Sequence, residues 1–299
     1  MVKVGIWGSS GFLGTELLKL LARRDDVDIV FGATSKEAVG TMEDVQIALL
    51  AVREKEAMEL APVLLARNIR VIDLSGAHRL HNPVLYVKYY KLIHTHPEFL
   101  REAIYGLPER SREHIHHARL VANPGCYATA MNLALLPLKK IRAITPRTKV
   151  IVRAFSGFTG AGRKATIPHY IIAYAGGRVH RHIAEVEQEL GLHGQIWFYP
   201  EKAPWPRGIK AVLRMKVAPS VHLPDFYRQF YAGEPFVRIR ETEVNIDDVV
   251  GTNFCDISVT TKGRYATIAA ALDNLSKGGA GQAVQNLNIM CGLPEEHVY

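Results

Sequence analysis

The spacing of apolar residues changes about halfway along the chain. Residues 2–7 form a short apolar run before a glycine, and Leu17, Leu18 and Leu21 then recur at helical spacing within 14–23. Further short apolar runs predict buried strands at 27–33, 45–52, 69–74 and 120–123. Helical patterns predict helices at 54–67 and 127–138. Strands that alternate with helices indicate a parallel sheet covered on both faces.

From about residue 148 the pattern changes to a period of two. Apolar residues alternate with more polar ones in the runs at 150–154, 209–217, 254–260 and 265–272. This alternation predicts a half-buried mixed or antiparallel sheet. Residues 279–291 are predicted to be helical again. We therefore expect an α/β protein of two domains, without an internal repeat or a flexible linker.

The composition is typical of a globular protein. With 48% hydrophobic residues among 299, the chain has enough apolar side chains for one large core or two smaller ones. This balance excludes collagen-like and low-complexity chains, and it argues against disorder. Three cysteines make no disulfide framework, so we expect a reducing, cytoplasmic compartment. No apolar run approaches the ~18 residues of a membrane span, and the start shows no signal-peptide pattern.

The net charge of +8 leaves several partners open. An excess of Lys and Arg suits nucleic acid, an anionic surface, an acidic protein or phosphorylated small molecules. The basic residues are scattered, without an arginine-rich arm or a basic helix. We therefore expect no nucleic-acid partner and rank that function last.

A glycine-rich loop follows the first predicted strand and opens the first predicted helix. It consists of Gly8, Ser9, Ser10, Gly11, Phe12, Leu13 and Gly14. In that position, glycines allow a tight turn, and the helix N-terminus faces a diphosphate. The spacing differs from G-x-G-x-x-G, and a glycine-rich turn without a ligand is the alternative.

The end of the second predicted strand bears on the choice of cofactor. NAD sites usually place an acid there for the ribose hydroxyls. In this chain, the first acid after the end of that strand is Glu37. Ser35 and Lys36 take its place, a pair that suits the 2′-phosphate of NADP(H). The alternative is a solvated loop lysine.

Cys126 lies between a predicted strand and an apolar helix, directly after Pro124 and Gly125. A helix N-terminus stabilises a thiolate, as a nucleophilic cysteine requires. A small buried hydrophobic residue is an equally probable interpretation of the position alone. Cys255 and Cys291 fit that second interpretation.

A histidine-rich segment follows Tyr174. His182 and Glu185 are three residues apart, so one helical face carries both, and His180 lies at the helix entry. A carboxylate on that face would orient an imidazole that acts as a general base. The alternatives are a solvated helix start and a metal-binding pair. No third and fourth ligand follow at a recognisable spacing, so we expect no metal.

Several strings together identify a family. They are GSSGFLGTELLKLL at 8–21, IDLSGAHRL at 72–80, YGLPE at 105–109, NPGCYATA at 123–130, SGFTGAGRK at 156–164, HRHIAEVEQ at 180–188, FYPEKAPWPRGI at 198–209 and DNLSKGGAGQAVQNLN at 273–288. With them the chain resembles the N-acetyl-γ-glutamyl-phosphate reductases, the NADP-dependent enzymes of arginine biosynthesis related to aspartate-semialdehyde dehydrogenase. The resemblance covers nearly the whole length.

The resemblance implies a fold. It implies a Rossmann-type dinucleotide-binding domain over 1–125, completed by the C-terminal helix at 273–299. Residues 126–272 would form an α+β catalytic and dimerisation domain with a mixed sheet. A homodimer or homotetramer is implied as well.

The resemblance also assigns roles to individual residues. Cys126 would be the nucleophile and His182 the acid/base, with His180, Tyr174 and Glu185 beside it. Ser156, Gly157 and Asn274 would line the cofactor side of the pocket. The residues that would bind substrate are Asn123, Arg163 and Arg207.

The implied reaction fits these residues. A Cys126 thiolate would attack an acyl phosphate and expel phosphate, and NADPH would reduce the resulting thioester to a semialdehyde. The chain departs from the family between Ser35 and Glu43, where roughly thirty residues are absent. It also carries Glu201 where the family often has His.

Two other functions stay open. In the first, the same chemistry acts on glutamyl or 2-aminoadipyl phosphate attached to an acidic amino-group carrier protein in lysine or arginine biosynthesis, and the basic charge favours such a partner. In the second, the chain is a non-catalytic dinucleotide-binding protein, which the retained Cys126 and His182 argue against.

Overall fold

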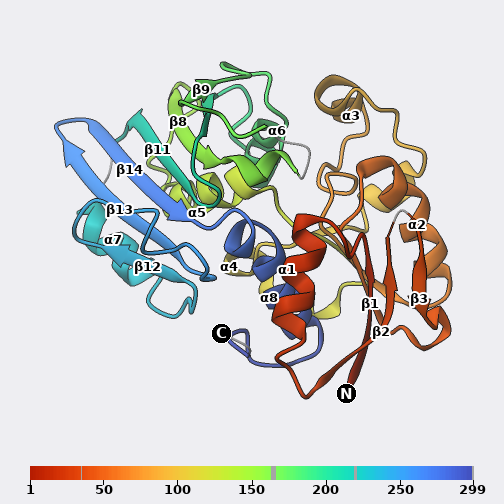
Figure 1. The fold of residues 1–299 in the computed structure, drawn as a ribbon. Coiled ribbons are helices and arrows are strands. Elements are labelled where there is room, and N and C mark those ends of the chain that lie inside the picture. The colour runs from red at the N-terminus through yellow and green to blue at the C-terminus, as the bar shows by residue number, and fades with distance from the viewer. Residues whose placement is uncertain (35, 163–165, 219–220, 298–299) are drawn as a thin grey trace. The chain divides into compact units, whose positions relative to one another are not determined.

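The computed structural model describes residues 1–34, 36–162, 166–218 and 221–297. The chain divides into two compact units (Figure 1). The first unit contains residues 1–124 and 279–299, and the second contains residues 125–278. Two of the predicted site residues, Ser35 and Arg163, lie outside the described residues.

The first unit is built on a seven-stranded sheet with the order β3-β2-β1-β4-β5-β7-β6. Six strands are parallel: β1 (Val2–Trp7), β2 (Val27–Ala33), β4 (Ile47–Leu50), β5 (Arg70–Asp73), β6 (Ile104–Tyr105) and β7 (Leu120–Ala122). β3 (Ala38–Gly40) is antiparallel to β2. The strand order reverses between β1 and β4, the position at which doubly wound sheets bind ligands.

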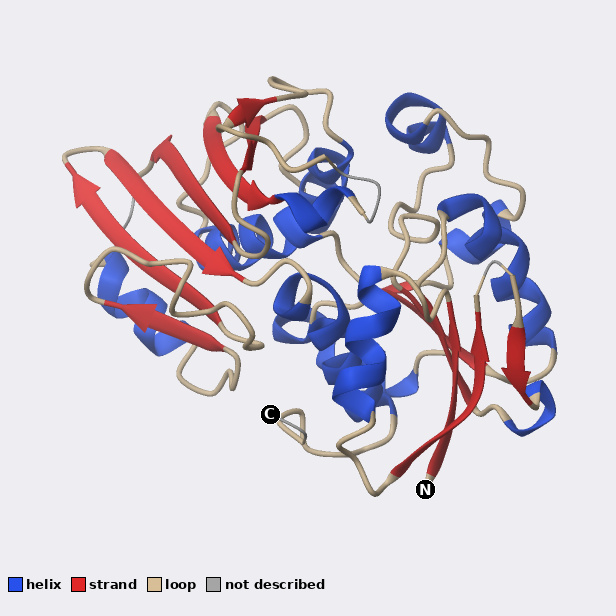
Figure 2. Cartoon of the chain, in the orientation of Figure 1, coloured by secondary structure: helices blue, strands red, loops and turns tan. Residues whose placement is uncertain are grey.

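Helices cover the sheet of the first unit (Figure 2). They are α1 (Phe12–Leu21), α2 (Glu54–Ala66), α4 (Pro108–His117) and α8 (Gly281–Met290). The helix α3 (Val84–Tyr90) lies beyond the sheet, and short 3₁₀ turns stand at Met42–Asp44 and Pro97–Leu100. Leu17 of α1 and Leu287 of α8 pack in one core with Ile6 of β1. All ten residues of α8 are buried, so this last helix completes the first unit.

The second unit is built on a mixed seven-stranded sheet with the order β12-β13-β14-β11-β8-β10-β9. Its strands are β8 (Val150–Gly157), β9 (Ile172–Ala173), β10 (Ile196–Ala203), β11 (Ile209–Lys216), β12 (Val237–Arg240), β13 (Cys255–Lys262) and β14 (Tyr265–Leu272). β8 pairs with β10 in parallel, whereas β11 is antiparallel to both of its neighbours. The predicted mixed sheet is confirmed.

The helices of the second unit pack on one face of this sheet. They are α5 (Cys126–Lys140), α6 (Arg181–Leu190) and α7 (Leu223–Phe230), with short helical turns at Phe158–Ala161 and Ser276–Ala280. Along β8, Val150, Val152 and Ala154 point toward the helices and are fully buried. The opposite face of the sheet exposes Ile151, Tyr199 and Tyr265.

Most element predictions from the sequence are confirmed within two residues. The strands at 2–7 and 27–33 have the predicted bounds, and α1 begins two residues earlier than predicted. The sequence pattern did not predict β10, because Pro200, Glu201 and Lys202 interrupt its apolar run. Within the described residues, no helix is both long and apolar enough to cross a membrane.

Candidate active site

Cys126 is the first residue of α5, as predicted. Gly125 is the N-cap, with extended backbone, and the first turn of the helix contains no acidic residue. The free backbone N–H groups of this turn place partial positive charge at the thiol. Such a position favours the thiolate, which is the nucleophilic form of cysteine. The thiol forms no disulfide and is half-buried.

His182 and Glu185 of α6 hold the residue that precedes Cys126. Glu185 is fully buried, and its Oε2 accepts a hydrogen bond from the Gly125 N–H at 2.9 Å. The His182 ring packs on Gly125 so closely that a Cβ there would lie 2.4 Å from Nε2. Nε2 is also 3.9 Å from Oε1 of Glu185. A glycine at position 125 is therefore required for His182 to approach the cysteine.

His180 is the N-cap of α6, at the helix entry that the sequence predicted. Its Nδ1 accepts a hydrogen bond from the His182 N–H at 3.2 Å, so Nδ1 is unprotonated. Burial, and then the charge of Arg181, lowers the pKa of His180 to about 4. At neutral pH, His180 is therefore an uncharged cap that fixes the first turn of α6.

Three aromatic residues pack around this pair of histidines. The Tyr127 ring lies 5.9 Å from both His180 and His182, and the Tyr174 ring lies 6.1 Å from His180. Phe198 of β10 closes the cluster at 5.1 Å from His180. Burial raises the pKa of Tyr174. A hydrogen bond with Tyr127 lowers this pKa, and a negative charge on Cys126 raises it. Tyr174 thus belongs to the surroundings of Cys126.

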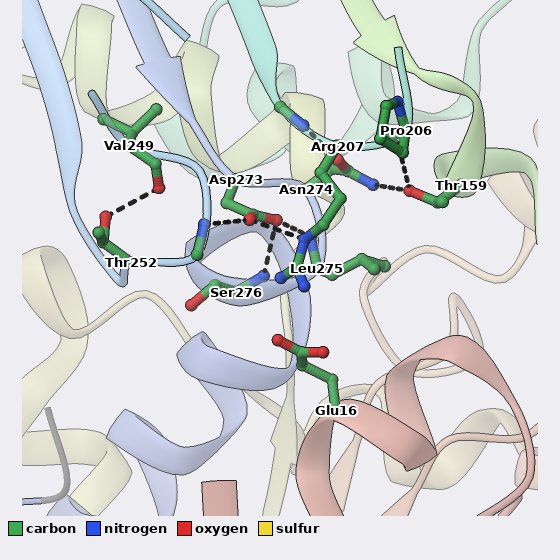
Figure 3. A network of polar contacts seen from close by, with 12 residues as sticks. Glu16, Thr159, Pro206, Arg207, Val249, Thr252, Asp273, Asn274, Leu275 and Ser276 are labelled. Atoms are coloured by element: carbon green, nitrogen blue, oxygen red, sulfur yellow. Dashed lines mark hydrogen bonds and ion pairs between the residues drawn. The ribbon is translucent and has the colours of Figure 1, made fainter. Parts of the chain in front are cut away.

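Asp273 organises the loop after β14 (Figure 3). Its carboxylate accepts hydrogen bonds from the N–H groups of Gly251, Leu275 and Ser276. It also forms an ion pair with Arg207, whose Nε is 2.8 Å from Oδ2. Asp273 is fully buried, so its charge depends on these partners. No role for Asp273 is predictable from the spacing of residues around it, because Arg207 and Gly251 lie on distant segments.

The loop that Asp273 organises reaches Cys126. The Gly278 N–H donates to the Asp273 carbonyl, and a Cβ at Gly278 would lie 2.8 Å from the Cβ of Cys126. Asn274 joins two further segments, since its Nδ2 donates to Thr159 and its Oδ1 accepts from the Gly208 N–H (Figure 3).

Ser156 and Gly157 stand at the end of β8, close to these segments. Ser156 donates to the Gly157 carbonyl, and a Cβ at Gly160 would lie 3.2 Å from the Ser156 Oγ. The second unit therefore contains nine of the predicted site residues: Cys126, Ser156, Gly157, Tyr174, His180, His182, Glu185, Arg207 and Asn274.

The glycine loop of the first unit has the close backbone approach that a diphosphate site needs. A Cβ at Gly8 would lie 2.3 Å from the Ala51 carbonyl, and one at Gly14 would lie 2.2 Å from the Gly8 carbonyl. Gly8 has a φ of +80°. Ser10 and Gly11 lead into α1, whose first turn holds no acid. The residues present therefore fit a dinucleotide phosphate at the start of α1.

The turn after β2 is held by Thr34. Its Oγ1 accepts hydrogen bonds from the N–H groups of Lys36 and Glu37, and Lys36 is exposed.

Asn123 also belongs to the first unit, where its amide donates to the Gly279 carbonyl and accepts from the Asn286 amide. Asn123 is 1% exposed, and both of these partners lie in its own unit.

Comparison with known proteins adds a family to this geometry. Residues 126–274 match the family model "Semialdehyde dehydrogenase, dimerisation domain", and residues 38–118 match "Semialdehyde dehydrogenase, NAD binding domain". An N-acetyl-gamma-glutamyl-phosphate reductase of Geobacter sp. (strain M21) is 41% identical over 99% of this chain and 97% of its own. The chain belongs to the N-acetyl-gamma-glutamyl-phosphate reductase family.

Further relatives agree with this assignment. Reductases of Geotalea daltonii and Thermus thermophilus are 42% and 38% identical, over 99% and 98% of this chain. The first of these alignments spans 339 positions against the 299 residues here, so the relatives carry segments that this member of the family lacks. The family models imply a nicotinamide dinucleotide cofactor and an oligomer.

Solved structures show the same fold at lower identity. Aspartate semialdehyde dehydrogenase II of Vibrio cholerae has a TM-score of 0.75 and 15% identity, covering 97% of this chain and 98% of its own. A probable aspartate-semialdehyde dehydrogenase of Pseudomonas aeruginosa has a TM-score of 0.73 and 17% identity, covering the same shares. The predicted fold class is confirmed.

Proposed function

We propose that this protein reduces N-acetyl-γ-glutamyl phosphate to N-acetylglutamate 5-semialdehyde and phosphate in arginine biosynthesis. The observation that carries the proposal is the position of Cys126 at the start of α5, with His182 and Glu185 held against Gly125. These residues supply a nucleophile, a proton carrier and a group that orients both. The names of the relatives supply the substrate.

The first step forms a thioester on Cys126. His182 accepts the thiol proton, and the thiolate attacks the acyl carbon. A C–S bond forms while the C–O bond to phosphate breaks, and inorganic phosphate leaves. The start of α5 and the Glu185 carboxylate lower the cost of the charges that develop, because one stabilises the thiolate and the other a protonated His182.

The second step returns the thiol. When bound, the reduced nicotinamide supplies the hydride that such a thioester needs to become an aldehyde. His182 gives back its proton as the C–S bond breaks, so Cys126 is regenerated. His180 remains neutral and holds the first turn of α6 in place throughout, because its Nδ1 accepts the His182 N–H. His180 and Glu185 are therefore positioning residues.

We infer that NADPH is the preferred cofactor. The Gly8 to Gly14 loop would hold the diphosphate, and the exposed Lys36 would meet the 2′-phosphate at the end of β2. We expect kcat/KM to be at least about tenfold higher with NADPH than with NADH, the effect of one charge-assisted contact. Equal values would contradict the assignment.

We infer further that the subunits associate through the outer face of the second unit's sheet. Ile151, Tyr199 and Tyr265 are 42%, 42% and 48% exposed on that face, and the matching family model is a dimerisation domain. A second copy of the chain is the occupant that these apolar groups favour.

We also infer that the enzyme acts in the cytoplasm, because a reducing compartment suits three cysteines that form no disulfide.

The Cys126→Ser variant tests the proposed function. We expect turnover of N-acetyl-γ-glutamyl phosphate to fall by at least about 10³-fold, because serine is a far weaker nucleophile at neutral pH. The matched control is Cys291→Ser, which changes another free, half-buried cysteine and leaves turnover intact. A C126S variant that keeps substrate-dependent NADPH oxidation would contradict the thioester mechanism.

A further inference from the structure

Lys202 occupies a position in β10 that the sheet normally gives to apolar residues. β10 lies beside β8 in register, with Ile196 opposite Val150 and Lys202 opposite Ser156. Ile196, Phe198 and Pro200 are buried on the helix-covered face. Since side chains alternate along a strand, Lys202 is the next residue on this face. A cation therefore follows three buried apolar residues on the face covered by α5 and α6.

The neighbouring residue confirms this orientation. Glu201 forms a two-point ion pair with Arg153 of β8, on the opposite face of the sheet. Arg153 is exposed there, with 64% of its side chain accessible. The two charges on the outer face thus satisfy each other, while Lys202 on the inner face is separate from them.

The Lys202 ammonium points toward the residues around Cys126. Its Nζ lies 5.3 Å from the centre of the Tyr174 ring. Tyr174 in turn packs against His180, whose ring lies 4.7 Å from that of His182, the residue that packs on Gly125 beside Cys126. Ser156 lies opposite Lys202 in the sheet, and its Oγ donates to the Gly157 carbonyl. Lys202 is thus part of the same cluster of side chains as the proposed nucleophile.

No described residue balances the charge of Lys202. Within the described part of the chain it forms neither an ion pair nor a hydrogen bond, and Tyr174 offers it only the face of a ring. Two other half-buried cations of this unit are paired, Arg178 with Glu187 and Arg207 with Asp273. A half-buried ammonium without an anion is suited to binding one from outside.

We propose that Lys202 binds an anionic group of the substrate next to Cys126. The inference rests on the proposed function, because it assumes a substrate with an anionic end. An acyl phosphate of an N-acylated amino dicarboxylic acid has two such ends, the phosphoryl group and the free carboxylate. Both offer oxygens to an ammonium in the same way, and kinetics distinguishes them. Lys202 then determines specificity for anionic acyl phosphates.

The first test probes Cys126 without any substrate. Iodoacetate is an anion and iodoacetamide is neutral, so the ratio of their alkylation rates at Cys126 reports a nearby cation. Peptide mass spectrometry separates Cys126 from Cys255 and Cys291. We expect Lys202→Met to lower this ratio by at least about threefold, and Lys202→Arg to retain it. The matched control is Lys216→Met, because Lys216 lies in the same sheet and has no ion pair within the described part of the chain. An unchanged ratio in K202M overturns the proposal.

The second test uses the reaction in reverse, with the semialdehyde, inorganic phosphate and NADP⁺. If Lys202 binds the phosphoryl group, K202M raises the KM for phosphate about tenfold or more. If it binds the carboxylate, the KM for the semialdehyde rises instead. If neither KM changes while the enzyme stays folded, the proposal is overturned. A wild-type enzyme without turnover would refute the proposed function, whereas the alkylation ratio would still decide the place of Lys202.

Discussion

Two histidines of this protein, His94 and His180, stay neutral well below the ordinary imidazole pKa. Burial, and then the charge of His78, lowers the pKa of His94 to about 4, as burial does for His180. His94 is 5% exposed, and its Nε2 and Nδ1 bond the Ala77 carbonyl and the His96 N–H. Both ring nitrogens are therefore satisfied in the neutral form, with the proton on Nε2.

The neutral histidines predict a loss of stability in mild acid. The unfolded chain takes up protons as the pH falls through about 6.5, whereas the folded chain takes them up only near 4. The free energy of unfolding should fall as the pH drops from about 6.5 to 4. Denaturant unfolding at several pH values should show a shallower fall in His94→Gln. The exposed His193→Gln variant is the control, and equal slopes in all three proteins would contradict the prediction.

At the scale of elements, the start of α1 depends on one glycine. Helix propensity alone favours alanine over glycine by about 1 kcal/mol. At Gly14, however, a Cβ would lie 2.2 Å from the Gly8 carbonyl and 2.7 Å from the Ser9 Cα. Both atoms belong to the backbone, so relief requires the loop itself to move. The packing of the loop on its helix thus outweighs the local preference.

We therefore expect Gly14→Ala to weaken NADPH binding by more than about tenfold and to lower Tm. Fluorescence titration and thermal unfolding measure the two effects. Gly233→Ala is the control, since a Cβ at Gly233 has no atom within 4 Å and its φ is not positive. A G14A variant that binds NADPH normally would show that the loop adapts.

The elements also show where sequence patterns fail. β1, β4, β5 and β7 of the first unit were predictable because both of their faces are largely buried, which gives short apolar runs. The short strands β3 and β6 were not predicted. β10 was missed because its inner face ends in Lys202 and its outer face carries the paired Glu201. Its register with β8 explains both residues, because it brings Glu201 to Arg153 and places Lys202 opposite Ser156. The residues that escaped prediction are those whose partners lie on other strands.

At the scale of the whole molecule, the scattered basic residues are partly gathered by the fold. A groove of about 1140 Å³ in the second unit is lined by Arg147, Lys149, Arg214, Lys216 and Arg264. Within the described residues, none of the five forms an ion pair. The groove includes Ala143, beyond the end of α5, whereas Cys126 begins that helix of 15 residues, about 22 Å long. Much of the net charge therefore lies far from the proposed chemistry.

The outer face of the same sheet should decide the oligomeric state. Ile151 is 42% exposed there, and Ile151→Lys would place a charge in the proposed interface. We expect light scattering after gel filtration to show a smaller species for this variant than for wild type. Val63→Lys changes a comparably exposed residue of α2 and should leave the mass unchanged. Equal masses for I151K and wild type would place the interface elsewhere.

The sequence by itself determined the order of most core elements, the family and the position of Cys126 at the start of a helix, because these depend on local spacing and on contiguous strings. The helix N-terminus at Cys126 is one example, since strand, turn and helix are adjacent in the chain. The tertiary structure alone decided which polar groups meet. Asp273 with Arg207 and Gly251, Glu185 with Gly125, and Lys202 with Tyr174 join distant segments. Such contacts follow from packing and strand register, which a pattern along one strand does not contain.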